Sequence, residues 1–267
     1  MKDIQGFKDL REHYSKEEIA KSYESLRFSN LAGKIEHKIT INILNSIIKK
    51  EQPELLLEIA TGPGRITKYI NLPNKGIGVD TSENMLRLAR KNVSNKNWKF
   101  LKVDINKMPF KKNHFDMIIT FRLLIHFTDK QRKNSYVKIK KILKNKGTFI
   151  FDIGNKNYKK PSFIKNLLKF YRILKKEEKN KLLPGIYNNP STLDNIVKEL
   201  KENKFKINKI YGVNYYNWFV LSLLSLSKRL RFSSNIIENI ILNFEKSKQS
   251  NLKNYATFII MAENEKN

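Results

Sequence analysis

The chain has 267 residues, 40% of them hydrophobic, which is enough for one large domain with a substantial buried core. It has no cysteine, which excludes disulfides, thiolate nucleophiles and Cys-ligated metals, and we expect no metal site. Lysine and arginine outnumber aspartate and glutamate by 53 to 25, but the charge is spread along the chain without an Arg-rich arm or basic tail. Nucleic acid therefore stays a candidate partner that no motif supports.

The N-terminal sequence and the hydropathy pattern bear on localisation. The first 18 residues have no apolar core of the kind found in signal peptides, and no stretch reaches the ~20 apolar residues of a membrane span. Together with the missing cysteines, these features predict a cytoplasmic protein.

In chain order, the predicted elements begin with helices. Apolar residues recur at helical spacing over residues 16–28 and 32–49, which predicts two amphipathic helices. Pro53 disfavours helix in the residue before it, and the apolar run Leu55–Ile59 then predicts a buried strand.

Strands and helices alternate after this first strand. Strands are predicted at 76–80, 98–104, 115–120 and 148–152, and helices at 65–70, 83–91 and 129–143, with Lys146-Gly147 as the stop of the last helix. This alternation predicts parallel βαβ units and therefore an α/β fold.

The alternation breaks after Asn155 and resumes near residue 192. The lysine-rich residues 155–190 are interpreted as an insertion or lid, followed by a helix at 192–202, strands at 205–213 and 255–263, and apolar helices between those strands at 218–230 and 236–244. We expect a single domain with four parts: a helical cap (1–50), a cofactor-binding core (51–154), the insertion (155–190) and the C-terminal part of the sheet (191–267).

A turn rich in small residues follows the first strand. It reads Glu58-Ile-Ala60-Thr-Gly62-Pro-Gly64, and the small side chains let the backbone pass close to a ligand. A turn of this kind is also common without any ligand, so its context decides the interpretation.

Two acids supply that context, because Asp80 and Asp104 close the next two predicted strands. In an open parallel sheet, ligands bind at the carboxyl ends of the strands near the switch point, so these acids are expected to meet at one site. Asp80 can accept both hydroxyl hydrogens of a ribose. Its alternative role is to cap the following helix, for which Thr81 and Ser82 are equally suited.

As a set, these residues resemble the class I S-adenosylmethionine-dependent methyltransferases, from about Glu54 to Asp152. The resemblance implies a seven-stranded, mostly parallel, Rossmann-like sheet with an antiparallel last strand, and S-adenosylmethionine as cofactor. It implies that the turn holds the methionine part, the acid after the second strand the ribose, and the acid after the third strand the adenine. The cofactor-binding residues are then Glu58, Ala60, Gly62, Gly64, Asp80, Thr81, Asp104, Ile105 and Phe121.

One departure and one rival fold bear on this resemblance. The family's usual turn begins with a glycine where this chain has Ala60, which adds a methyl group near the cofactor. A nicotinamide or flavin dinucleotide fold would need G-x-G-x-x-G, yet Thr67 stands at the last glycine and Pro63 between the first two. That rival also predicts no acid at position 104, so the methyltransferase interpretation is favoured.

Proton removal, where an acceptor needs it, is assigned to His126, just after the fourth strand, where the active-site loop of the family lies. The alternative for His126 is a packing or substrate-wall residue.

Arg122 is a candidate for binding an acidic substrate group. Tyr14, Tyr23 and Arg27 are candidates for covering the cofactor, although such residues more often belong to a surface or core.

The predicted function is methyl transfer to a small-molecule or lipid acceptor by a monomer or homodimer. The apolar segment from Trp218, with Lys228, Arg229 and Arg231 after it, is interpreted as a lid helix or as a peripheral membrane contact.

Two alternative functions stay open. An RNA methyltransferase is supported only by the charge and lacks an Asn-Pro-Pro-Tyr-like motif after the fourth strand, while a non-catalytic binding module need not keep the whole set of cofactor residues.

Overall fold

The structure, a computed structural model, describes residues 6–20, 31–71, 74–158, 188–215, 239, 242–243 and 252–265. Its helices are α1 (Gly6–Ser15), α3 (Leu31–Glu51), α4 (Glu83–Asn92), α5 (Asp129–Ile142) and α7 (Leu193–Glu202). Its strands are β1 (Leu55–Ile59), β2 (Lys75–Asp80), β3 (Trp98–Lys102), β4 (Phe115–Thr120), β5 (Leu143–Gly154), β6 (Phe205–Tyr215) and β7 (Tyr255–Asn264). Short 3₁₀ turns are η1 (Thr67–Tyr69), η2 (Ile105–Lys107), η3 (Leu124–His126) and η4 (Leu252–Asn254).

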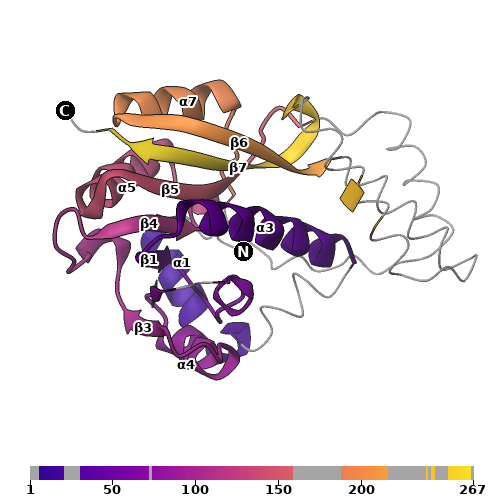
Figure 1. Ribbon diagram of the computed structural model, residues 1–267. Coiled ribbons are helices and arrows are strands. Elements are labelled where there is room, and N and C mark those ends of the chain that lie inside the picture. The colour runs from indigo at the N-terminus through magenta and orange to yellow at the C-terminus, as the bar shows by residue number, and fades with distance from the viewer. Residues whose placement is uncertain are drawn as a thin grey trace, which may run out of the picture.

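The described strands form one sheet in the order β3-β2-β1-β4-β5-β7-β6 (Figure 1). Strands β1 to β5 pair in parallel, whereas β7 runs antiparallel to both of its neighbours, β5 and β6. This confirms the predicted Rossmann-like, mostly parallel sheet with an antiparallel last strand. The strand order reverses at β1, which pairs with β2 on one side and β4 on the other, so the ends of β1 and β4 frame the switch point.

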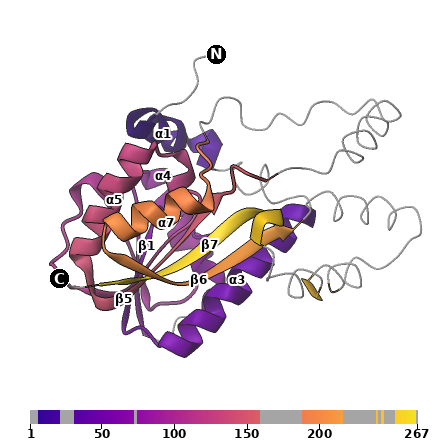
Figure 2. The ribbon, with the colours of Figure 1, turned by 90° about the horizontal axis from the view of Figure 1, so that it is seen from above.

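Helices bury apolar side chains against both faces of the sheet. On one face, Tyr136 and Ile139 of α5 and Leu200 of α7 have no exposed surface and join the strand residues in one core. On the other face, α3 contributes Leu44 and Ile48 to a second core. Figure 2 shows α3 on the opposite side of the sheet from α5 and α7. Burial on both faces holds the strands, and therefore the strand ends at the switch point, in fixed positions.

Local signals determine where the helices begin and end. Thr128 and Gln131 form a capping box at the start of α5, each side chain accepting the other residue's backbone N–H. Thr192 caps α7 by accepting the N–H of Asn195. Helix α3 ends at Glu51, two residues before Pro53, in agreement with the prediction.

Three elements differ from their predictions. The helix predicted at 65–70 shortens to the turn η1, which follows Gly64, a residue in the left-handed region with φ +82°. The strand predicted at 98–104 ends at Lys102, and Asp104 instead caps η2. The strand predicted at 148–152 begins at Leu143 directly after α5, so the predicted stop at Lys146-Gly147 lies inside β5, where pairing with β4 is irregular.

Other predictions concern residues outside those described. These are most of the insertion (159–187), the helices at 218–230 and 236–244 for all but a few positions, and Tyr23 and Arg27. The helix predicted at 16–28 is helical at 17–20, and α1 is a helix that the apolar pattern did not predict. Of the helices that the structure describes, none combines the length and the hydrophobicity of a membrane span.

Candidate active site

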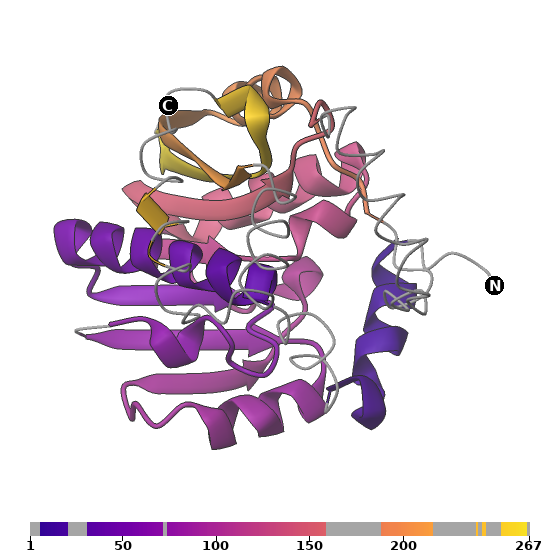
Figure 3. The same ribbon diagram turned by 90° about the vertical axis from the view of Figure 1, so that its right-hand side faces the viewer.

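An open cavity lies where β1, β2 and β4 end. Eight of the ten predicted site residues line it: Ala60, Gly62, Asp80, Thr81, Asp104, Ile105, Phe121 and His126. Glu58 and Gly64 lie outside its wall. Helix α1 stands beside the strand ends and contributes Arg11 and Tyr14 to the wall (Figure 3).

The turn after β1 is built from three left-handed residues. Ala60, Gly62 and Gly64 have φ values of +58°, +56° and +82°. Ala60 therefore adopts the conformation for which glycine is preferred, at a cost of about 1–2 kcal/mol. The N–H of Thr61 donates to the carbonyl of Val79 at 3.0 Å, which ties the turn to β2.

Glu58 stabilises this turn through hydrogen bonds. Its side chain is only 2% exposed, and its Oε2 accepts the hydroxyls of Thr61, at 3.1 Å, and of Thr67. Burial raises the pKa of Glu58 to about 7, although both hydroxyl hydrogen bonds act in the opposite direction. Since the carboxyl lies outside the cavity wall, the structure shows it shaping the turn, and a direct contact with a cofactor stays a prediction.

Gly64 and Gly62 provide a matched pair for testing the turn. A Cβ on Gly64 would lie 2.8 Å from Val93 Cγ2 and 3.3 Å from the backbone of Ala89, whereas a Cβ on Gly62 would meet nothing within 4 Å. We expect Gly64→Ala to lower the free energy of unfolding by about 3 kcal/mol, from backbone strain plus overpacking. Gly62→Ala carries only the strain, about 1–2 kcal/mol. Urea unfolding measures both losses, and equal losses would contradict the contact with α4.

Asp80 organises the end of β2. Its Oδ2 accepts the N–H of Gly62 and its Oδ1 the N–H of Ser82, both at 2.9 Å. Ser82, and not Asp80, is the N-cap of α4, since its hydroxyl accepts the N–H of Met85 at 3.3 Å. Burial raises the pKa of the Asp80 carboxyl, against the hydrogen bonds from these backbone N–H groups. The carboxyl thus lies in the cavity wall while holding the turn.

Asp104 connects the end of the third strand to helix α1. Its Oδ1 accepts the N–H of Asn106 at 2.8 Å, and its Oδ2 pairs with Arg11 Nη1, also at 2.8 Å. Two further contacts fix α1 and the residues after it on α4: Asn84 Nδ2 donates to the carbonyl of Ser15 at 2.7 Å, and Arg87 pairs with Glu17 at 3.2 Å. Tyr14 lies in the cavity wall, and its role in covering the cofactor stays a prediction, whereas Arg11 was not predicted.

The other side of the cavity is formed by the β4–α5 loop, residues 121–128. It contributes Phe121, Arg122, Leu123, His126 and Phe127 to the wall. Arg122 is left-handed, with φ +62°, and its N–H donates at 2.6 Å to Oδ1 of Asp152, a carboxylate that is 5% exposed. His126 lies in η3 and is 2% exposed, so its ring is enclosed by protein at the cavity wall.

Sequence reasoning missed four wall residues: Arg11, Met85, Leu123 and Phe127. Met85 follows the N-cap of α4 by three residues, and Leu123 and Phe127 flank η3, so their nearness to Asp80 and His126 in the sequence was a usable signal. Arg11 offered no such signal, because it reaches Asp104 across 93 residues.

Two sequence comparisons bear on this site. A family described as a methyltransferase domain matches residues 56–147, a range that includes the turn, Asp80, Asp104 and His126. A ubiquinone/menaquinone biosynthesis C-methyltransferase from Wigglesworthia glossinidia brevipalpis is 27% identical over 184 residues, which cover 65% of this chain and 71% of that protein.

Solved structures share the fold. Magnesium protoporphyrin IX methyltransferase from Synechocystis PCC 6803, with bound S-adenosylhomocysteine, matches with a TM-score of 0.61 and 14% identity over 96% of this chain and 98% of that one. Phosphoethanolamine N-methyltransferase 2 from Haemonchus contortus, in complex with S-adenosyl-L-methionine, matches with a TM-score of 0.57 and 18% identity over 94% of this chain and 58% of that one. At these identities, the likeness shows a common fold.

Proposed function

We propose that this chain, a class I S-adenosylmethionine-dependent methyltransferase, methylates a small-molecule or lipophilic acceptor. The observation that best supports this proposal is the cavity at the switch point, whose wall contains one acid from the end of β2 and another from beyond β3. The similar proteins are named for quinone biosynthesis, a porphyrin and phosphoethanolamine, all of which involve small molecules.

The wall residues suggest how the chain holds its cofactor. S-adenosylmethionine supplies, when bound, a methyl group that is already activated on a sulfonium. Asp80 has carboxylate lone pairs beyond those used by Gly62 and Ser82, and with Thr81 it would accept the ribose hydroxyls. Asp104 and Ile105 would hold the adenine, and the backbone at Ala60 and Gly62 the methionine part. Orientation of this kind can lower a barrier by ~7–11 kcal/mol.

His126 is the residue that we assign to proton removal from the acceptor. It lies in the cavity wall on the β4–α5 loop. A neutral imidazole has one ring nitrogen that can accept a proton, which suits this role. Its neighbours Phe121, Leu123 and Phe127 give this part of the wall an apolar lining, which suits a planar or lipophilic acceptor.

Calorimetric titration tests the cofactor assignment. We expect micromolar binding of S-adenosylmethionine and S-adenosylhomocysteine and no binding of NADH, because the turn after β1 has Thr67 in place of the last glycine of G-x-G-x-x-G. Failure of the first two ligands to bind would instead favour a non-catalytic module with this fold.

Transfer of a labelled methyl group to a panel of acceptors tests the acceptor class. The panel contains a prenylated quinol, magnesium protoporphyrin, phosphoethanolamine and bulk RNA, and we expect methylation of a small molecule. Repeating the assay with His126→Gln should lower kcat at least 100-fold for an acceptor that must lose a proton, a typical size for loss of a general base. Methylation of RNA alone, weakening between low and moderate salt, would identify the RNA methyltransferase alternative.

A further inference from the structure

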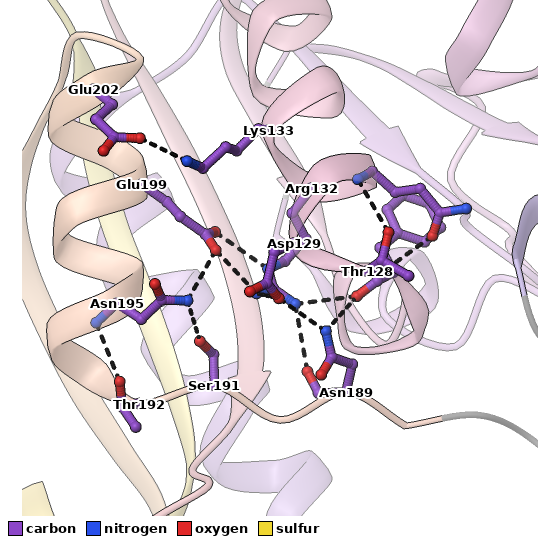
Figure 4. Close-up of polar contacts among 12 residues, drawn as sticks. Thr128, Asp129, Arg132, Lys133, Asn189, Ser191, Thr192, Asn195, Glu199 and Glu202 are labelled. Atoms are coloured by element: carbon purple, nitrogen blue, oxygen red, sulfur yellow. Dashed lines mark hydrogen bonds and ion pairs between the residues drawn. The ribbon is translucent and has the colours of Figure 1, made fainter.

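A buried arginine contacts the end of the β4–α5 loop. Arg132 of α5 has no exposed surface, and its guanidinium forms a two-point pair with Glu199 of α7, Nε to Oε2 at 3.2 Å and Nη2 to Oε1 at 3.0 Å. Glu199 is itself 1% exposed and also accepts Asn195 Nδ2 at 3.0 Å. Figure 4 shows this pair between the two helices. A buried ion pair of this kind persists only when its remaining donors are also satisfied.

The remaining donors of Arg132 reach the loop. Its Nη1 donates to the carbonyls of Phe127, at 3.0 Å, and Asn189, at 3.4 Å, and its Nη2 donates to Asp129 Oδ1 at 2.6 Å. The guanidinium therefore joins α7, the start of α5 and the end of the β4–α5 loop. Lysine has a single ammonium and cannot place donors on all of these acceptors in the same geometry.

Asn189 holds the same loop through three further contacts. Its backbone N–H donates to the carbonyl of Ile125 at 2.6 Å, and its Nδ2 donates to the carbonyl of Phe127 and to Asp129 Oδ1, both at 3.0 Å. The carbonyls of Ile125 and Phe127 flank His126 in the sequence. The backbone on both sides of His126 is thus pinned from the side away from the cavity.

We propose that Arg132, Glu199 and Asn189 are positioning residues for the acceptor side of the active site. They act through the carbonyls of Ile125 and Phe127, which fix where His126 and Phe127 lie in the cavity wall. None of the three lines the cavity formed by the described residues, so we expect them to act indirectly. This inference rests on the proposed function in assigning the His126 side of the cavity to the acceptor.

The chain offers a matched control on the same two helices. Lys133 of α5 pairs with Glu202 of α7 at 2.7 Å, with both side chains more than 40% exposed. This pair also joins α5 to α7, and Figure 4 shows it apart from the contacts that Arg132 makes with Glu199 and Asp129. Lys133→Ala therefore removes an α5–α7 ion pair without disturbing the carbonyls beside His126.

The test compares Arg132→Lys, Asn189→Ala and Lys133→Ala by ¹H–¹³C NMR of the histidine rings. The chain has four histidines. We expect Arg132→Lys and Asn189→Ala each to shift and broaden the His126 signal, while the signal of His37 on α3 stays in place. Lys133→Ala should shift neither signal. Asn189→Ala removes no buried charge, so it keeps the test decisive if Arg132→Lys does not fold.

Activity provides the second readout. Once an acceptor is identified, Arg132→Lys and Asn189→Ala should each lower kcat about 10-fold, while KM for S-adenosylmethionine and the Kd for S-adenosylhomocysteine change less than 3-fold. An unchanged His126 signal in Asn189→Ala, or an equal change in Lys133→Ala, would overturn the proposal. The NMR readout needs neither cofactor nor acceptor, so it keeps its meaning even if the chain binds no S-adenosylmethionine.

Discussion

Asp80→Ala is expected to weaken binding of S-adenosylhomocysteine about 100-fold or more. Two hydrogen bonds from ribose hydroxyls to a carboxylate would be lost, and each hydrogen bond to a charged group contributes about 1.5–3 kcal/mol. The same substitution removes the acceptor of the Gly62 N–H, which loosens the turn that lines the cavity. Calorimetry measures the change in Kd, and Asp80→Asn, which keeps one acceptor oxygen, should lose less, about 10-fold.

Asp116→Asn is the control for this loss. Like Asp80, Asp116 accepts a backbone N–H, that of Leu55 at 2.9 Å, but it also pairs with Lys144 at 2.6 Å and lies at the start of β4, at the opposite end of the sheet. Its substitution should leave the Kd for S-adenosylhomocysteine unchanged within about 2-fold. An Asp80→Ala protein that folds and binds with wild-type affinity would remove the ribose assignment.

The sheet was largely predictable, because buried parallel strands are continuous apolar runs with clear ends. Leu55–Ile59 and Phe115–Thr120 have the bounds that the sequence predicted. The bounds were wrong where tertiary pairing prevailed over a local signal: Lys146-Gly147 is a strong helix stop, yet pairing of Leu143 with Phe115 of β4 extends β5 back to Leu143. The antiparallel position of β7 followed from the resemblance and not from the apolar pattern.

The candidate site was predictable where its residues stand next to strand ends. Asp80 and Asp104 follow apolar runs, so topology alone brings them together. Arg11 and Arg132 were not predictable. Each resembles one more cation on a helix surface, and its role depends on a partner far away in the sequence. Asp104 binds Arg11, which stays 47% exposed, and Glu199 binds the fully buried Arg132.

Glu58 leads to the second prediction with a large effect, a pH dependence of stability. Its pKa is raised by burial from 4.5 to about 7, so between these values the folded chain binds more protons than the unfolded chain. The stabilising contribution of Glu58 is therefore fully present below pH 4.5 and is lost as the pH rises to about 7. The loss amounts to about 3 kcal/mol.

Glu58→Gln should remove this dependence. Glutamine keeps an acceptor for the hydroxyls of Thr61 and Thr67 but carries no proton that titrates. Urea unfolding of both proteins from pH 5 to pH 8 measures the difference in their free energies of unfolding, which we expect to move in favour of the variant by up to about 3 kcal/mol as the pH rises. Asp152 is also buried with a raised pKa, but it is present in both proteins, so its titration cancels in the difference.

The same variant separates the two roles of Glu58. If the carboxyl only shapes the turn, Glu58→Gln keeps its hydroxyl contacts and should bind S-adenosylhomocysteine within about 3-fold of the wild type. A stability difference that stays constant from pH 5 to pH 8 would contradict the raised pKa. A large loss of affinity in a variant whose unfolding is otherwise as expected would instead show that the cofactor reaches Glu58 directly, past a wall that the structure forms from Ala60 and Gly62.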